Sequence, residues 1–209
     1  EAMDLAHGAA FYPTASVRAA SIDEMLDADA VIIAAGKGGG PKDSRLDLLR
    51  VNATIVHGIA QRLSAMQGML VIVTNPVDVM TQVAAEASGL PLPRVIGTGT
   101  MLDTARLREA LGRTLELEPR SIHAQVVGEH GDSEVVLWSS ARVGGRSLRQ
   151  WPGFERSREP ELAARVRRAA YEIIARKGAT NHAIGLVTAH LLKWALRDSD
   201  LGKPALFHE

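Results

Sequence analysis

The chain has 209 residues, 46% of them hydrophobic and 23% charged, which is the ordinary composition of a folded globular protein. Lysine plus arginine number 24, as do aspartate plus glutamate, so the net charge is zero and the concentrated positive surface that binds nucleic acid is not expected. The sequence contains no cysteine, which excludes disulfides and thiolate chemistry, and no apolar run approaches the ~20 residues that span a bilayer. We therefore expect a cytoplasmic protein that binds neither nucleic acid nor a membrane.

Short apolar runs and amphipathic segments alternate along the first hundred residues. The apolar runs predict strands, in chain order over residues 17–22, 30–35, 69–74 and 94–97. The run at 30–35 is continuous, as in a strand buried on both faces, and a glycine-rich loop over residues 36–41 follows it. Apolar residues at helical spacing predict a long helix over residues 44–66, and Pro76 suits the first turn of a second helix that ends near residue 88.

The second half begins with a predicted helix over residues 101–112 and ends in strongly helical sequence over residues 159–197, with a break near residue 178. Between them, strands are predicted over residues 121–127 and 134–143. The alternation of strand, helix and strand predicts a parallel α/β sheet, and such sheets bind ligands at the carboxyl ends of their strands. The loops at those ends are 36–40, 74–76 and 97–100.

The sharpest local feature is the segment Gly-Glu-His-Gly-Asp-Ser at residues 128–133, which follows a predicted strand. Histidine titrates near neutral pH, so His130 can serve as a general acid or base. A loop histidine that is hydrogen-bonded to its neighbours explains the same pattern. A metal site that uses Glu129, Asp132 and Glu134 beside His130 is disfavoured, because no second histidine stands at helical spacing.

Two further charged groups stand close to the predicted strand ends. Asp103 and Arg106 are three residues apart on one helix face, where the carboxylate can orient a histidine and the guanidinium can bind a carboxylate. A surface ion pair is the alternative. Arg45 follows the glycine-rich loop and is either a lid arginine or a solvated side chain beside acidic neighbours. The glycines at 36–40 form neither a Walker loop nor the GxGxxG fingerprint.

Three ordered motifs, at residues 75–78 (Asn-Pro-Val-Asp), 97–106 and 128–133, resemble those of the L-lactate/malate dehydrogenase family. The resemblance extends from residues 1–5 to residues 180–185, and the last motif looks more lactate-like than malate-like. It implies a partial doubly wound (Rossmann) parallel sheet followed by part of an α+β substrate domain. We expect the NAD-binding domain to cover residues 1–98 and the catalytic domain residues 99–209.

The resemblance also implies roles for individual side chains. His130 matches the proton donor and acceptor, Asp103 the carboxylate that orients its imidazole, and Arg45 the loop arginine that polarises the substrate carbonyl. The residues that match substrate-binding positions are Arg106, Asn75, Thr180 and Gly39. The residues that match NAD-binding positions are Ala35, Gly36, Thr74, Asn75, Thr98 and Ile184.

The implied activity is that of an NAD-dependent L-2-hydroxy acid dehydrogenase, most simply one that interconverts lactate and pyruvate by hydride transfer. Gly39 stands where the family typically has Gln for lactate or Arg for malate. Without arginine a second substrate carboxylate has no partner, so malate is disfavoured. Glycine leaves room for larger groups, so a dehydrogenase of bulkier acids such as L-2-hydroxyisocaproate remains an alternative.

The resemblance carries further implications for partners and completeness. We expect a homo-oligomer, either a dimer or a tetramer, and Arg108 and His123 match the positions that bind fructose 1,6-bisphosphate in some bacterial members. Two unrelated surface residues are the alternative. The family's GxGxxG strand and its final helix have no counterpart in the sequence, so we expect part of a longer chain that binds NAD weakly. A non-catalytic remnant and a metal-dependent hydrolase are the alternatives from other classes.

Overall fold

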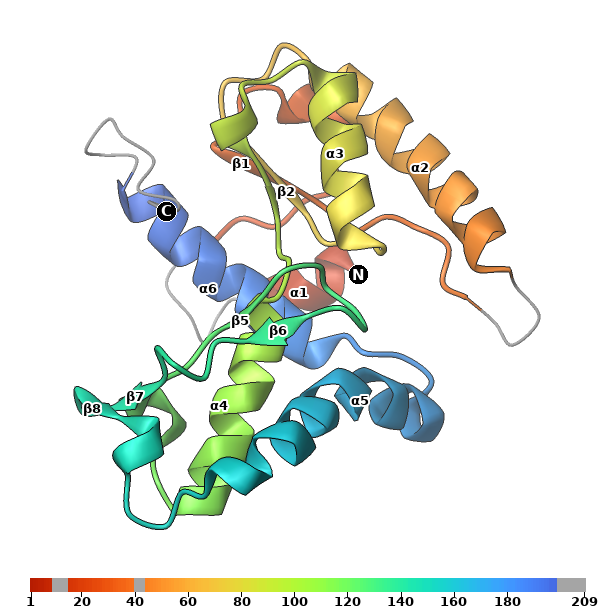
Figure 1. The fold of residues 1–209 in the computed structure, drawn as a ribbon. Helices are drawn as coiled ribbons and strands as arrows, with labels where there is room; N and C mark the ends of the chain where they lie inside the picture. The colour runs from red at the N-terminus through yellow and green to blue at the C-terminus, as the bar shows by residue number, and fades with distance from the viewer. Residues whose placement is uncertain (9–14, 40–43, 199–209) are drawn as a thin grey trace.

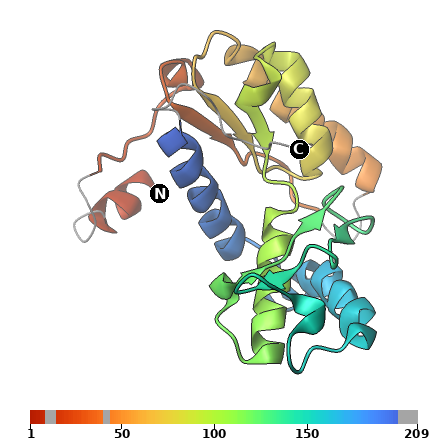
Figure 2. The same cartoon turned by 60° about the vertical axis from the view of Figure 1, so that its left-hand side comes forward.

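The computed structural model describes residues 1–8, 15–39 and 44–198 and has two halves, each with its own hydrophobic core (Figures 1 and 2). One core cluster draws its buried residues from between Val31 and Val95, and the other from between Leu107 and Val166. Among the described residues, no helix combines the length and the apolar character that crossing a membrane needs.

A three-stranded parallel sheet is the framework of the first half. Its strands are β1 (Ala30–Ile33), β2 (Met69–Ile72) and β3 (Val95–Gly97). They lie side by side in chain order, and Ile72 of β2 is opposite both Ile33 and Gly97. The predicted parallel sheet is confirmed, and the loops after all three strands emerge at the same edge.

Two crossover helices, α2 (Arg45–Arg62) and α3 (Val77–Ser88), pack against one another and cover one face of this sheet (Figure 1). Val56 of α2 and Met80 of α3 are fully buried together with Ile72 of β2. Burying such side chains removes apolar surface from water at about 25 cal/mol per Å², which is what holds helices of this kind against a sheet. The first helix was expected from its apolar spacing, and the second from Pro76 at its start.

The predicted strand over residues 17–22 is wrong. Residues 15–21 form no ladder with any described strand, and most of their side chains are exposed. A short 3₁₀ turn, Ile22–Met25, follows instead, and the Glu24 carboxylate that accepts the Ser21 backbone N–H fixes its start. A strand needs a neighbour to take up its backbone hydrogen bonds, and none of the described residues supplies one here.

The expectation that the strand at residues 30–35 is buried on both faces is also wrong. β1 ends at Ile33 and forms the edge of the sheet, bonded to β2 alone among the described strands. Val31 and Ile33 are buried, whereas Ile32 between them is 44% exposed. A continuous apolar run predicts full burial only where helices cover both faces, and here one face of the edge strand is open.

The second half surrounds α4 (Met101–Leu115), which packs along α5 (Glu159–Lys177) (Figures 1 and 2). The predicted strands over 121–127 and 134–143 are replaced by short antiparallel pieces of two residues each. These pieces are β4 (Ile122–His123), β5 (Val126–Val127), β6 (Val135–Val136), β7 (Arg142–Val143) and β8 (Arg146–Ser147). β4, β7 and β8 form one sheet, and β5 pairs with β6.

The remaining helices are α1 (Ala2–Gly8) and α6 (His182–Asp198). The predicted helix break near residue 178 is confirmed, because Gly178 ends α5 and α6 begins four residues later. α6 contacts α4 and runs from the second half back toward the sheet of the first (Figures 1 and 2). Leu191 and Ala195 of α6 are buried, whereas Leu186 and Trp194 are exposed.

Candidate active site

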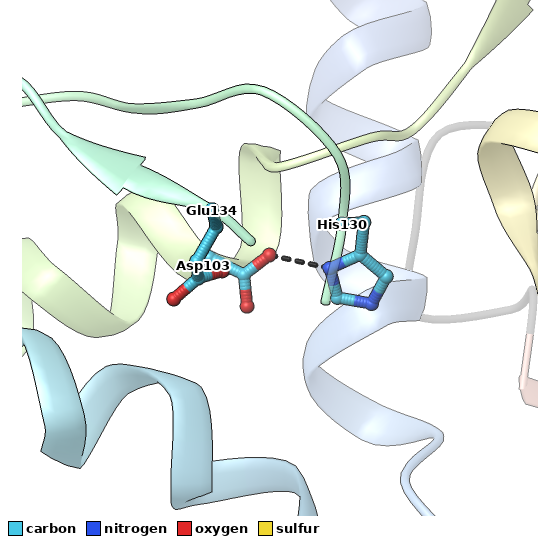
Figure 3. A group of neighbouring side chains, drawn as sticks. All are labelled: Asp103, His130 and Glu134. Carbon is cyan, nitrogen blue, oxygen red and sulfur yellow. Dashed lines mark hydrogen bonds and ion pairs between the residues drawn. The ribbon is translucent and has the colours of Figure 1, made fainter. Parts of the chain in front are cut away.

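His130 lies in the loop that joins β5 to β6. The loop begins at Gly128, whose φ of 91° is in the left-handed region that glycine adopts without a Cβ penalty. The imidazole Nδ1 lies 2.5 Å from Oδ2 of Asp103, which is on α4 and only 2% exposed (Figure 3). A loop and a helix that are distant in sequence thus hold one imidazole against one buried carboxylate.

Asp103 has a second partner on its own helix. Its Oδ1 accepts a hydrogen bond from Nη1 of Arg106 at 2.8 Å, across the i,i+3 spacing that places both residues on one helix face. Arg106 is largely buried as well. The structure therefore brings together three of the predicted site residues, with the carboxylate of Asp103 between a cationic guanidinium and the imidazole of His130.

The electrostatics of this group favour a protonated histidine. The hydrogen bond that the His130 ring donates to Asp103 raises the pKa of His130 above its usual value, with burial opposing this shift and the Asp103 charge adding to it. Because the ring keeps Nδ1 toward Asp103, Nε2 is the nitrogen left to exchange a proton with a ligand (Figure 3). Such a histidine can deliver a proton near neutral pH and take it back.

Asp78 fixes the backbone of the histidine loop, a role that sequence reasoning missed. It lies in the first turn of α3, and its Oδ2 accepts the backbone N–H of His130 at 2.9 Å. This contact links the sheet half to the histidine loop across 52 residues of sequence. The only signal in the sequence was that Asp78 closes the motif at residues 75–78, which carries no information on its partner.

Glu134 is the second residue whose place was missed. The sequence offered it as a metal ligand alongside Glu129 and Asp132, but these two acids are exposed whereas Glu134 is 3% exposed. Each of Glu134, Asp103 and His130 has one potential metal-binding atom, a carboxylate oxygen or a ring nitrogen, and these three atoms lie within 4.8 Å of one another (Figure 3). A glutamate directly before an apolar strand piece was the available signal.

Apart from Ile184, the predicted cofactor residues gather at the carboxyl edge of the parallel sheet. The Thr74 hydroxyl donates to the carbonyl of Ala35 at 2.8 Å, which joins the ends of β1 and β2. A Cβ added to Gly36 would lie 2.7 Å from the Thr74 methyl group, so only glycine allows this approach. The Thr98 backbone N–H donates to the carbonyl of Ile72 at 3.0 Å, which brings the end of β3 to the same edge.

Asn52 of α2 ties two of these strand-end loops together and was not predicted. Its side-chain Oδ1 accepts the backbone N–H of Lys37 at 2.7 Å, and its Nδ2 donates to the carbonyl of Asn75 at 2.9 Å. Asn52 is buried, whereas the Asn75 side chain is exposed. A polar residue on the sheet-facing side of an amphipathic helix was the signal that could have identified Asn52.

Several predicted residues lie apart from this group. Arg45 is the first residue of α2 and Gly39 is in the loop before it; the Arg45 side chain lies outside the described part of the chain. Thr180 precedes α6 and Ile184 lies in its first turn, both half-buried. Within the described residues, no hydrogen bond joins Thr180 or Ile184 to His130.

Arg108 and His123 lie on neighbouring elements of the second half. The Arg108 Nε donates to the carbonyl of Ala124 at 3.1 Å, directly after His123, and burial lowers the pKa of Arg108. His123 is the exposed residue of β4. The two side chains therefore come from adjacent backbone, on α4 and β4.

Comparisons with known proteins agree with this arrangement of sheet and loop. The family model described as lactate/malate dehydrogenase, NAD binding domain, matches residues 1–97, and the model of the alpha/beta C-terminal domain matches residues 100–203. The L-lactate dehydrogenase of Synechococcus sp. is 41% identical over 95% of this chain, and L-lactate dehydrogenase 2 of Enterococcus faecalis is 43% identical over 95% of it.

Solved structures give the same result. The minor L-lactate dehydrogenase from Enterococcus mundtii, in its ligands-bound form, matches 93% of this chain with a TM-score of 0.89 and 42% identity. The chain covers 64% of that structure, 66% of the Synechococcus protein and 65% of the Enterococcus faecalis protein. Two family models in the expected order, together with relatives above 40% identity, show that this chain belongs to the lactate/malate dehydrogenase family.

Proposed function

We propose that this chain carries the acid–base and substrate-binding groups of an NAD-dependent L-2-hydroxy acid dehydrogenase, most simply one that interconverts L-lactate and pyruvate. The observation that carries the proposal is the pairing of Asp103 with His130 at 2.5 Å and with Arg106 at 2.8 Å. One histidine, oriented by a buried carboxylate and close to an arginine, is the set of groups that proton exchange with a 2-oxo acid requires.

His130 is the acid and base of the proposed reaction. In the reduction of a 2-oxo acid, the imidazolium gives its Nε2 proton to the carbonyl oxygen as that carbon is reduced, and in the reverse direction the neutral ring takes the hydroxyl proton. Asp103 holds the ring in one tautomer through Nδ1 and stabilises the imidazolium form. The raised pKa of His130 keeps the proton available near neutral pH.

Arginines bind and polarise the substrate in this proposal. Arg106 uses Nη1 toward Asp103, and a guanidinium has five N–H donors, so the remaining fork can bind the substrate carboxylate in a bidentate pair. Arg45, at the start of α2, is the candidate for polarising the carbonyl. Asn75 and Thr180 complete the proposed substrate contacts.

The sheet edge fits the adenine dinucleotide cofactor. The cradle at Gly36, which a Cβ would fill, leaves exposed backbone beside Thr74 at the carboxyl ends of the strands, where parallel sheets bind nucleotides. NAD, when bound, supplies or accepts the hydride at the substrate carbon. The residues that would hold it are Ala35, Gly36, Thr74, Asn75, Thr98 and Ile184.

The proposal is tested with the purified full-length protein that contains these 209 residues. We expect oxidation of NADH with pyruvate, and His130→Asn lowers that turnover about 10³-fold or more because it removes the proton donor. His57→Asn, on the exposed side of α2, is the matched control and leaves turnover unchanged. Full turnover in His130→Asn contradicts the assignment. If wild-type protein binds no NADH in calorimetry, a non-catalytic role is favoured instead.

A substrate larger than pyruvate is the second candidate, favoured by Gly39. Glycine at this loop position presents no side chain to the substrate, so a branched 2-oxo acid has room where a glutamine would contact pyruvate. Comparing kcat/KM for pyruvate and 2-oxoisocaproate decides between them. A higher kcat/KM for pyruvate supports lactate chemistry, and a higher kcat/KM for 2-oxoisocaproate supports the bulkier acid.

We propose a division into an NAD-binding domain at residues 1–98 and a catalytic domain at residues 99–209, supported by the two separate core clusters. A homo-oligomer, a dimer or a tetramer, is part of the same proposal, and exposed Leu186 and Trp194 on α6 support it.

Arg108 and His123, on adjacent backbone, are proposed to bind fructose 1,6-bisphosphate. If titration with this compound changes neither activity nor oligomer size, the effector site is ruled out.

A further inference from the structure

Glu134 is a buried acid that the proposed chemistry does not use. It follows the histidine loop, lies immediately before β6 and is 3% exposed. Among the side chains that the structure describes, its Oε1 is the buried polar atom without a hydrogen-bond partner. An unpaired buried polar atom is costly and uncommon in folded proteins, so its presence next to the His130–Asp103 pair calls for a physical reason.

The charges around Glu134 come from three elements. Asp103 and Arg106 face it from α4, His130 faces it from the loop, and Arg167 faces it from α5, where its Nη2 donates to the Glu134 carbonyl at 3.2 Å. Two guanidinium groups near the three ligand atoms repel a divalent cation, and Asp103 already uses one oxygen for Arg106 and the other for His130. A proton is therefore the natural occupant of this cluster.

The two neighbouring carboxyl groups have different surroundings. Burial, reinforced by the charge of Asp103, raises the pKa of Glu134 to about 7, while His130 and the two arginines act in the opposite direction. Asp103 accepts two charge-assisted hydrogen bonds, one from Arg106 and one from the His130 ring. Near neutral pH, Glu134 thus exchanges its proton with water beside the His130–Asp103 pair.

We infer that Glu134 is a positioning residue that adjusts how firmly His130 holds its proton, by adding or withdrawing a second negative charge beside the His130–Asp103 pair. As pH rises, Glu134 releases its proton to water and its new charge stabilises the imidazolium of His130. The histidine therefore stays protonated over a wider pH range than an isolated pair would allow. Its relevance to substrate reduction rests on the proposed dehydrogenase function, but the coupling itself does not.

The direct test follows the His130 ring by nuclear magnetic resonance with carbon-13 labelled histidine, from about pH 5 to pH 9. His130→Asn identifies the signal among the seven histidines. In Glu134→Gln, which keeps the shape and removes the titration, we expect the midpoint to fall by about half a pH unit or more and the curve to become that of a single site. Glu161→Gln, an exposed acid in the first turn of α5, is the matched control and follows the wild type.

Superimposable His130 titrations in wild type and Glu134→Gln overturn the inference. If Glu134→Gln does not fold, the carboxyl carbon of Glu134 is titrated in the wild type after through-bond assignment. A midpoint near 7 supports the coupling, and a midpoint below about 5, close to the usual value of 4.5, overturns it. If Glu134 were merely structural, His130 would titrate identically in wild type and Glu134→Gln, and the Glu134 carboxyl would titrate near its usual value of 4.5.

These measurements need neither NADH nor turnover, so their outcome is independent of the dehydrogenase assignment. A protein that oxidises no NADH but shows the shifted titration loses the proposed function and keeps the coupling. Where turnover is present, Glu134→Gln makes kcat/KM for pyruvate decline at a lower pH than in the wild type. If Glu134→Gln has a normal kcat and its kcat/KM declines at the same alkaline pH as in the wild type, Glu134 does not adjust His130 during turnover.

Discussion

At the scale of single residues, Asp103 organises the site, because one buried carboxylate satisfies two cationic or protonatable groups. Its Oδ1 holds Arg106 and its Oδ2 holds His130, so the arginine and the imidazole are placed relative to one another without direct contact. Rotating or neutralising this carboxylate loosens both partners at once. Removing one partner of a buried ion pair also leaves the other charge uncompensated. The free-energy cost of that charge exceeds the stabilisation that the intact pair provides.

The substitution Asp103→Asn tests this organisation. An amide keeps the shape but cannot stabilise the imidazolium, so we expect the pKa of His130 to fall and kcat/KM for pyruvate at neutral pH to drop about 10² to 10⁴-fold. Steady-state kinetics across pH gives both values. Asp47→Asn, at an exposed ion pair of α2, provides the control and retains full activity. Equal activity in both variants contradicts the role of Asp103.

Sequence reasoning identified the residues that act through short-range spacing. Asp103 and Arg106 share a helix face by their separation of three residues, and His130 stands out between two glycines. Asp78 and Glu134 could not be found this way, because their partners are set by tertiary packing. A carboxylate whose partner is 52 residues away leaves no local pattern, and the burial of Glu134 depends on α4 and α5.

At the scale of elements, the ends of the parallel strands are held together by close backbone approach. Gly36 leaves β1 beside Thr74, which follows β2, and Asn52 of α2 bridges the loops beyond both strands. The strand ends thus form one connected edge. Parallel strands always bring their carboxyl ends together, which is why the sequence predicted the location of this edge but not the bridge from α2.

Gly36→Ala is expected to destabilise this edge. The added Cβ would lie 2.7 Å from the Thr74 methyl group and 3.1 Å from Oδ1 of Asn52, so we expect a loss of about 1 to 3 kcal/mol in the free energy of unfolding. Gly38→Ala is the matched control two residues on, where a Cβ meets nothing within 4 Å. Urea unfolding measures both. Equal stabilities would show that the loop relaxes freely around Gly36.

Removal of the contact between α3 and the histidine loop has a different expected effect. Asp78→Ala deletes the acceptor for the His130 backbone N–H, so we expect kcat/KM for pyruvate to fall about 10- to 100-fold through misplacement of the ring. Asp78→Asn keeps an acceptor oxygen and retains most of the activity. Kinetics of both variants separates placement from charge, because an equal loss of activity in the alanine and asparagine variants would assign the effect to the charge of Asp78.

The strand predictions show what a local pattern can and cannot determine. The run at 69–74 became β2 because neighbours on both sides take up its hydrogen bonds, whereas the run at 17–22 has no partner among the described strands. The two strands expected over 121–127 and 134–143 broke into pairs of two residues around the site loop. Apolar content predicts where a strand can form, and pairing decides whether it does.

At the scale of the whole molecule, the site lies where the two halves meet, and its residues belong to neither hydrophobic core cluster. The Asp78–His130 hydrogen bond crosses from the sheet half to the second half, and α6 returns from the second half toward the sheet. The ordered motifs indicated the family, and they stand at the ends of strands and the starts of helices. Side-chain placement between the two halves required the structure, because it depends on contacts distant in sequence.

Two groups at this junction make the stability of the protein depend on pH. The folded pKa of His130 is raised, so its stabilising contribution is present at low pH and is lost as pH rises through the folded value. The pKa of Glu134 is raised from 4.5 to about 7, so the folded state also holds a proton that the unfolded state releases. Glu24, whose pKa is lowered to about 2, titrates below this range.

We therefore expect the free energy of unfolding to fall between about pH 5 and pH 8, with Glu134 contributing up to about 3 kcal/mol of the decline. Urea unfolding at several pH values measures this slope. Glu134→Gln removes most of it, because the amide does not ionise in the interior, whereas Glu161→Gln leaves it intact. A free energy of unfolding that is constant or rises over this range would show that neither buried group binds its proton more tightly in the folded state.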